Sequence, residues 1–294
     1  MRFRRKAMLR ILTGILVFIV PIVSFGQSDE PTNPKVKSQY SKGAIAVIGT
    51  GDMGDSFGPR LAALGYQVIY GSRNPTSDKV KALVASTGHD ATATTQKAAA
   101  QQADVVLLAI PWPAMEAVAQ NLGDLGGKVV IDMSWPPADV AEDGYAQITI
   151  ETSAAELIQG WNPDAMVVKA FLTVWSHVID EPPSAGGPVS IPIASNYRHA
   201  KEITGQIAAD LGLDPVDAGP LRFARNIEAL TELALVPWYQ GREDLWNIYF
   251  QRSNFIACNG YGGDGADEET TPIVDAGNLA VMPSTQALAQ SCAN

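Results

Sequence analysis

Apolar and polar positions alternate along residues 44–132 in the order that a parallel α/β sheet requires. Short apolar runs, typical of buried parallel strands, are each followed by a stretch with helical periodicity. Strands are predicted at residues 44–48, 67–70, 91–93, 104–110 and 128–132, and helices at 53–64, 77–86, 97–102 and 114–122. Since about five such steps fit into about 90 residues, the pattern predicts a doubly wound parallel sheet of the Rossmann type.

The pattern continues beyond residue 150 with longer gaps between elements. Ser153 is placed to cap a helix over residues 154–160, and Pro237 to stop the last helix of the series. Further strands are predicted at 166–171 and 189–194, and further helices at 198–211 and 221–235. We expect these elements to form a small C-terminal lobe packed on the sheet. The predicted boundaries are a Rossmann domain at 43–150, this lobe at 151–257 and an irregular, acidic, glycine-rich tail at 258–294.

The first 26 residues have the pattern of a secretory signal peptide. A positively charged region precedes an apolar stretch over residues 11–25, and Ser24 and Gly26 fit a small-residue cleavage site. Cleavage leaves a flexible linker at 27–42. The expected location is periplasmic or extracellular, and the pair Arg4-Arg5 hints at twin-arginine export. An uncleaved N-terminal membrane anchor stays open as the alternative.

Charge and composition narrow the range of partners. The formal net charge is -10, which argues against nucleic acid as a ligand, because binding phosphates requires a basic field. Two cysteines, Cys258 and Cys292, are compatible either with a disulfide or with two free thiols. The histidines are isolated and no Cys/His metal spacing occurs, so we expect no metal site.

A glycine-rich turn follows the first predicted strand and opens the first predicted helix: Gly49-Thr50-Gly51-Asp52-Met53-Gly54. Such glycines let the backbone approach a pyrophosphate at a helix N-terminus. About twenty residues on, Ser72-Arg73-Asn74 stand where an NAD site places an acidic residue. A Ser/Arg pair suits the additional phosphate of NADP(H). The two segments together predict an NADP site, although Arg73 also fits a solvated loop charge and Met53 a core residue.

A loop with the sequence Met133-Ser134-Trp135-Pro136-Pro137 follows the fifth predicted strand. In open α/β sheets ligands bind outside the carboxyl ends of the strands, so this loop is a candidate for lining the nicotinamide pocket. A proline-stiffened connection with Trp135 packed in the core explains the sequence equally well.

Several blocks in one order make the chain resemble the NADPH:F420 oxidoreductase family, whose fold also serves the cytosolic reductase domain of STEAP-type metalloreductases. The resemblance covers about residues 44–238. It rests on the glycine turn, on residues 70–75, on Val167-Val168-Lys169-Ala170-Phe171, and on residues 212–221 with Ala224-Arg225 and Glu228.

The resemblance implies a hydride passed between NADP(H) and a flavin-like partner, either the deazaflavin F420 or FAD. Thr50, Gly51, Asp52 and Met53 would then hold the pyrophosphate, within the turn bounded by Gly49 and Gly54. Ser72, Arg73 and Asn74 would hold the 2′-phosphate. The residues implied for the nicotinamide half and the reacting ring are Ala109, Ile110, Pro111, Ala170 and Phe171.

No catalytic acid/base residue is required for such a transfer, because the cofactors carry the chemistry and the protein holds them in reacting geometry. The sequence offers no convincing Ser/His/Asp or Cys/His arrangement, and Asp217 and Glu228 are expected only to cap or bridge elements. Leu172 stands where the family usually has an asparagine, which leaves the redox partner open. The alternatives are reduction of a quinone or ferric chelate, and a non-catalytic exported NADP-binding protein; a homodimer also stays open.

Overall fold

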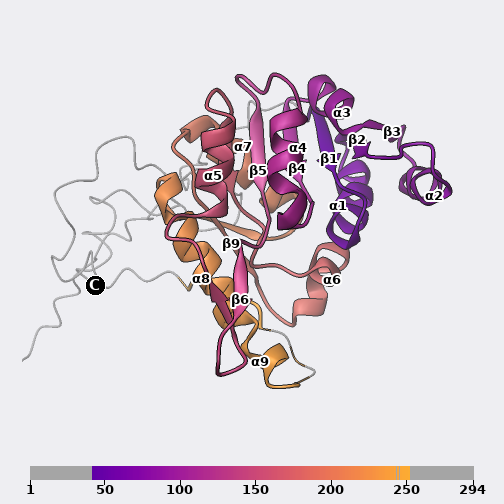
Figure 1. Cartoon of the computed structure of the whole chain (residues 1–294). Helices are drawn as coiled ribbons and strands as arrows, with labels where there is room; N and C mark the ends of the chain where they lie inside the picture. The colour runs from indigo at the N-terminus through magenta and orange to yellow at the C-terminus, as the bar shows by residue number, and fades with distance from the viewer. Residues whose placement is uncertain (1–41, 243, 245, 252–294) are drawn as a thin grey trace, which may run out of the picture. The chain divides into compact units, whose positions relative to one another are not determined.

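Six parallel strands form one sheet in the order β3-β2-β1-β4-β5-β8 in the computed structural model, which describes residues 42–242, 244 and 246–251 (Figure 1). The strands are β1 (Ala44–Ile48), β2 (Gln67–Ser72), β3 (Thr92–Thr95), β4 (Val105–Leu108), β5 (Val129–Asp132) and β8 (Met166–Lys169). The order reverses between β1 and β4, as in a doubly wound fold. The predicted fold class is confirmed.

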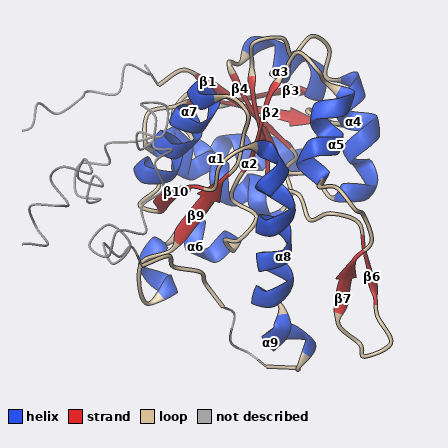
Figure 2. Cartoon of the chain, turned by 90° about the vertical axis from the view of Figure 1, so that its left-hand side faces the viewer, coloured by secondary structure: helices blue, strands red, loops and turns tan. Residues whose placement is uncertain are grey.

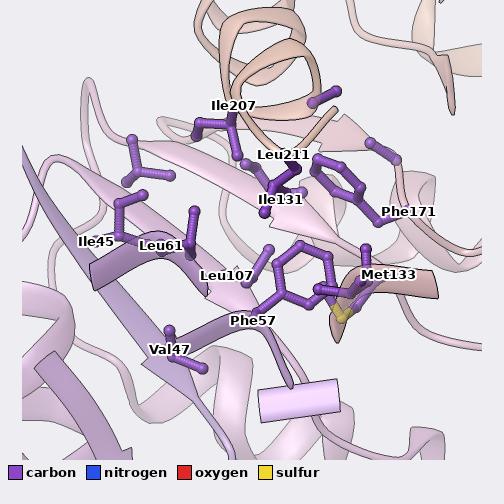
Figure 3. Close-up of a cluster of buried hydrophobic side chains, with 14 of the residues drawn as sticks. Ile45, Val47, Phe57, Leu61, Leu107, Ile131, Met133, Phe171, Ile207 and Leu211 are labelled. Carbon is purple, nitrogen blue, oxygen red and sulfur yellow. The ribbon is translucent and has the colours of Figure 1, made fainter. Parts of the chain in front are cut away.

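Helices cover both faces of this sheet, because each strand buries alternate side chains on opposite sides. Ile45 and Val47 of β1 pack in a cluster with side chains of α1, α6 and α7, whereas Ala46 and Ile48 pack with side chains of α3, α4 and α5. The helices are α1 (Asp52–Ala63), α2 (Asp78–Thr87), α3 (Gln96–Gln102), α4 (Met115–Asn121), α5 (Ala154–Trp161), α6 (Ser176–Asp180) and α7 (Arg198–Asp210). Figure 3 shows Ile207 of α7, and Leu211 directly after that helix, facing Ile131 of β5.

The remaining elements are a second, two-stranded sheet, a hairpin and further helical segments. Strands β9 (Ser190–Ile193) and β10 (Asp214–Asp217) pair in parallel, and an isolated antiparallel bridge joins Lys169 to Ala194. A hairpin of β6 (Ala138–Val140) and β7 (Ala146–Ile148) extends away from the sheet alongside α8 (Ala224–Ala234) (Figure 2). Short elements complete the chain: α9 (Val236–Tyr239) and the 3-10 turns η1 (Trp112–Ala114), η2 (Pro182–Ala185) and η3 (Leu221–Phe223).

The last predicted helix differs in detail from the observed one. The segment predicted as one helix begins with the 3-10 turn η3 and continues as α8, which ends at Ala234. Pro237 lies inside the separate short helix α9, where a proline near the first position needs no backbone N–H donor. Leu233, an apolar residue of the predicted helix, is 56% exposed, so the buried stripe of α8 leaves out part of its apolar side chains.

Three predicted segments fall outside the described residues: the signal peptide at 1–26, all but Lys42 of the linker at 27–42, and the tail at 258–294 with Cys258 and Cys292. The boundary predicted at residue 150 stays a prediction. Strand β8 lies beyond that boundary and is nevertheless the sixth strand of the main sheet. Within the part of the chain that the structure describes, no helix is long and apolar enough to cross a membrane.

Candidate nucleotide-binding site

The turn between β1 and α1 meets the carboxyl ends of both neighbouring strands. Ile48 is in register with Gly71 of β2 and with Leu108 of β4. The backbone N–H of Gly49 donates to the Gly71 carbonyl at 3.1 Å, and that of Ala109 donates to the Ile48 carbonyl at 2.9 Å. Gly49 has φ of +119°, and a Cβ there would overlap the Ala109 carbonyl oxygen, so this position requires glycine.

The N-terminus of α1 faces open space. A Cβ placed on Gly51 would have no heavy atom within 4 Å, whereas one on Gly54 would overlap the Gly49 carbonyl oxygen. Side-chain hydroxyls of Ser77, Thr95 and Ser153 cap α2, α3 and α5, but no side chain among the described residues caps α1. The first N–H groups of α1 are therefore available to an anion, and the turn fits a pyrophosphate.

The segment predicted to bind the 2′-phosphate is an ordered turn after β2. The backbone N–H of Asn74 donates to Ser72 Oγ at 3.1 Å, and the N–H of Ser77 donates to the Asn74 carbonyl at 3.2 Å. Arg73 is exposed and forms no hydrogen bond or ion pair with any described residue. Its guanidinium is thus available to a phosphate, which it can hold with two parallel hydrogen bonds.

The segment after β4 contributes Ala109, Ile110 and Pro111. Ala109 and Ile110 are partly buried, and Pro111 is exposed and precedes η1. Trp112 in η1 stacks on Trp161 of α5, with ring centroids 5.8 Å apart. This stacking fixes the path of the chain as it leaves the carboxyl end of β4, next to the glycine turn.

Ala170 and Phe171 follow β8 and are fully buried. The Phe171 ring packs against the ring of Phe57 in α1, edge to face, with centroids 5.1 Å apart (Figure 3). Its φ of +60° is unusual for a residue with a side chain and turns the backbone sharply at the strand end. The Phe171 side chain is a core residue, and Met53 also packs on this core. A cofactor role for Ala170, Phe171 and Met53 stays a prediction.

A buried ionic cluster, which the sequence analysis did not assign, lies at the same edge of the sheet. Lys169 Nζ is 2.9 Å from Asp132 Oδ2 and 3.0 Å from Glu228 Oε1, and all three side chains are fully buried. The ammonium also donates to the Ser134 carbonyl at 2.7 Å. Asp132 and Lys169 are in register at the ends of β5 and β8. The ammonium therefore joins two strands, the loop after β5 and α8.

Glu228 reaches this cluster from α8 and also bonds to α5. Its carboxylate accepts the Ala154 N–H at 3.0 Å. Burial raises the pKa of Glu228, Lys169 opposes that shift, and the charge of Asp132 adds to it. The expectation that Glu228 and Asp217 cap or bridge elements is confirmed, since Asp217 pairs with Lys201 at 2.7 Å and accepts the Gly219 N–H.

The signals for this cluster are present in the sequence but weak. Lys169 ends the apolar strand Met166–Lys169, and Asp132 ends the apolar strand Val129–Asp132. A lysine or aspartate that is fully buried requires a partner. Sequence spacing alone did not identify which partner. The described residues contain no group of three or more His, Cys, Asp or Glu side chains arranged to hold a metal ion.

The loop at residues 133–137 lies partly in the core, and its role in lining a nicotinamide pocket stays a prediction. Met133 and Ser134 are buried, and Met133 belongs to the core (Figure 3). Trp135 is only partly buried. The loop then enters β6, an element that the sequence did not predict.

The sheet order, the reversal between β1 and β4 and the glycine turn at that point define a Rossmann-type dinucleotide-binding protein. Residues 44–136 match the family described as NADP oxidoreductase, coenzyme F420-dependent. The chain is 32% identical over 206 residues to the F420-dependent NADP reductase of Methanothermobacter marburgensis, covering 65% of this chain and 90% of that protein. The chain therefore belongs to the F420-dependent NADP oxidoreductase family.

Two further similarities extend this result. The metalloreductase STEAP3 of Rattus norvegicus is 27% identical over 194 residues, which cover 66% of this chain. The chain spans only 37% of the length of that metalloreductase. A crystal structure assigned as an F420-dependent NADP reductase, from Arthrobacter sp. FB24, superposes with a TM-score of 0.63 at 26% identity, covering 71% of this chain and 99% of that one.

Proposed function

We propose that this protein binds NADP(H) and transfers a hydride between it and a flavin or deazaflavin acceptor. The observation that carries the proposal is the glycine turn that opens α1 at the reversal of the sheet order, together with Arg73 directly after the neighbouring strand β2, whose guanidinium has no partner among the described residues. The first suits a pyrophosphate and the second suits a 2′-phosphate. Family membership supports the NADP part of the proposal.

The residues act by binding and orienting. In this proposal the backbone N–H groups of residues 50–53 hold the pyrophosphate, and Ser72, Arg73 and Asn74 hold the 2′-phosphate. The segment from Ala109 to Pro111 directs the nicotinamide half toward the carboxyl end of β4. The bound nicotinamide supplies the hydride chemistry. The protein contributes by holding donor and acceptor carbons close, and needs no acid/base residue for that task.

The acceptor is the less determined part of the proposal. Relatives are named as F420-dependent NADP reductases and as metalloreductases, which favours F420 or FAD in this chain. Leu172 in place of a polar residue, with Trp175 nearby in the chain, makes a more apolar acceptor such as a quinone the second candidate. This second candidate, reduction of another small acceptor, also includes reduction of a ferric chelate.

An absorption spectrum of the purified protein followed by an acceptor screen tests the proposal. NADPH oxidation is measured at 340 nm with F420, FAD, a quinone and ferric citrate offered separately. We expect steady turnover with F420 or FAD. Turnover with quinone or ferric citrate alone moves the assignment to the second candidate. NADPH binding without turnover on any acceptor leaves a non-catalytic binding protein, and absence of NADPH binding rejects the proposal.

We also infer that the protein is exported. The charged N-terminal region, the apolar residues 11–25 and the small residues before Gln27 support this. Export of a folded holoprotein explains how an NADP site can exist outside the cytoplasm. Fractionation of the native host with mass determination of the N-terminus tests the inference, and a cytoplasmic protein that retains Met1 contradicts it.

A further inference from the structure

Ser134 is held at both backbone groups by the buried ionic cluster. Its N–H donates to Asp132 Oδ1 at 2.8 Å, and its carbonyl accepts Lys169 Nζ at 2.7 Å. Asp132 and Lys169 also pair with each other at 2.9 Å. The position of Ser134, two residues beyond β5, is therefore fixed by two charged, fully buried side chains.

The hydroxyl of Ser134 has no such partner. The residue is 4% exposed, and its Oγ is buried without a hydrogen bond to any described residue. A buried hydroxyl left unsatisfied lowers the stability of the fold, so such groups commonly mark a site for a ligand or water. Rotation about χ1 moves this hydroxyl among three staggered positions while the backbone stays held.

Ser134 lies on the side of the sheet where the nicotinamide end of a bound dinucleotide is expected. The cofactor of a Rossmann fold lies across the reversal point of the sheet, here between β1 and β4. Ser72 and Arg73, on the β2 side, would bind the adenosine half. Strand β5 lies on the other side of β4, with Asp132 in register with Leu108. The loop that contains Ser134 thus belongs to the nicotinamide side.

We propose that Ser134 contacts the cofactor, with its hydroxyl bonded to the carboxamide of the bound nicotinamide, and that Asp132 and Lys169 are positioning residues that hold it there. A carboxamide offers two N–H donors and a carbonyl acceptor, and a serine hydroxyl can serve either. The contact satisfies the orphaned hydroxyl when NADP(H) binds. The inference rests on the proposed NADP function.

The test compares Ser134→Ala with the wild type in three measurements. The dissociation constant of NADPH rises about three- to tenfold, the range for one lost hydrogen bond. The dissociation constant of 2′,5′-ADP, which contains only the adenosine half, is unchanged. The melting temperature is unchanged or higher, because the alanine removes an unsatisfied hydroxyl without breaking a protein hydrogen bond.

Thr204→Val is the matched control. It removes a buried hydroxyl in α7 that does have a partner, the Ala200 carbonyl at 2.8 Å. This control lowers the melting temperature and leaves the NADPH affinity unchanged. An unchanged NADPH affinity in Ser134→Ala overturns the inference, as does an equal loss for NADPH and 2′,5′-ADP. A wild-type protein that binds neither compound overturns the proposed function as well.

Discussion

Single glycines set how closely α1 approaches the sheet. A Cβ on Gly54 would overlap the carbonyl oxygen of Gly49, and one on Gly58 would overlap the ring of Tyr70 in β2. The Tyr70 hydroxyl is itself bonded to Thr87 Oγ1 at 2.7 Å, and burial raises the pKa of Tyr70 to about 12. The helix therefore lies close to the sheet, and its N-terminus lies at the carboxyl ends of the strands, as does Arg73.

Arg73→Ala tests the most specific residue of the site. Loss of a charge-assisted contact to the 2′-phosphate weakens NADPH binding by about 1.5 to 3 kcal/mol. NADH lacks this phosphate and loses much less. Fluorescence titration of both nucleotides measures the difference. Equal losses for NADPH and NADH contradict the assigned role.

Local sequence was sufficient to select these residues as candidates for the nucleotide site, because a glycine turn and the residues after the second strand act through backbone geometry and a single charge. Lys169 was different. A lysine at the end of an apolar strand can reach solvent or be buried, and only its two carboxylate partners, distant in sequence, decide between these outcomes.

At the scale of elements, the start of α5 is the best defined junction. Ser153 Oγ caps the helix by accepting the Glu156 N–H, and the Glu156 carboxylate accepts hydrogen bonds from the hydroxyls of Ser153 and Thr152. Arg225 of α8 adds an ion pair to Glu156 at 3.1 Å. The junction thus joins α5 to α8 through one carboxylate.

The pH dependence of stability tests this junction. Burial alone would raise the pKa of Glu156, but hydrogen bonds from Ser153, Thr152 and Arg225 lower it below its ordinary value of 4.5. A depressed folded-state pKa contributes stability above the unfolded-state pKa, and that contribution is lost as pH falls through the folded value. Urea unfolding of Glu156→Gln therefore differs most from wild type near neutral pH, and the difference shrinks in acid.

Glu202→Gln is the control for this measurement. Its carboxylate lies 2.9 Å from Arg198 Nε and 4.0 Å from His199 Nδ1, both within α7, so it links no other element and its removal changes stability little. A difference between wild type and Glu156→Gln that stays constant from neutral to acidic pH contradicts the interpretation.

The long periodic helices were predictable, and several of the shortest elements outside the repeating strand–helix pattern were not. The predictions for α1, α2 and α7 agree with the structure to within a residue or two at each end. The hairpin β6–β7 and the helix α6 have three to five residues per element, too few to show a period. Strand β10 begins Asp-Pro, a pair that favours a turn, and is a strand because it pairs with β9.

At the scale of the whole molecule, the cluster of Asp132, Lys169 and Glu228 joins the sheet to the C-terminal helices. The charges come from β5, β8 and α8, and the N-terminus of α5 adds a backbone donor. Removing one partner of a buried ion pair leaves an uncompensated charge in a medium of low dielectric constant. The cluster should therefore be the most sensitive ionic contact of the described fold.

Lys169→Met tests this expectation. The variant leaves two buried carboxylates without a cation and loses about 3 to 5 kcal/mol of unfolding free energy. Lys201→Met, which breaks the partly exposed pair with Asp217, loses about 1 kcal/mol or less. Denaturant unfolding of both variants gives the comparison. Equal and small losses of unfolding free energy in the two variants would show that the buried cluster contributes no more to stability than a partly exposed ion pair.

The sequence by itself determined the alternation of strands and helices over residues 44–132, the glycine turn and the charge at Arg73, because periodicity, backbone freedom and a local motif are readable within about thirty residues. Only the tertiary structure decided that Lys169, Asp132 and Glu228 meet, that Phe171 packs in the core, and that Ser134 keeps a hydroxyl without a partner. These features depend on which strands lie side by side and what is buried between them. Contacts between segments distant in the chain leave no periodic trace in the sequence.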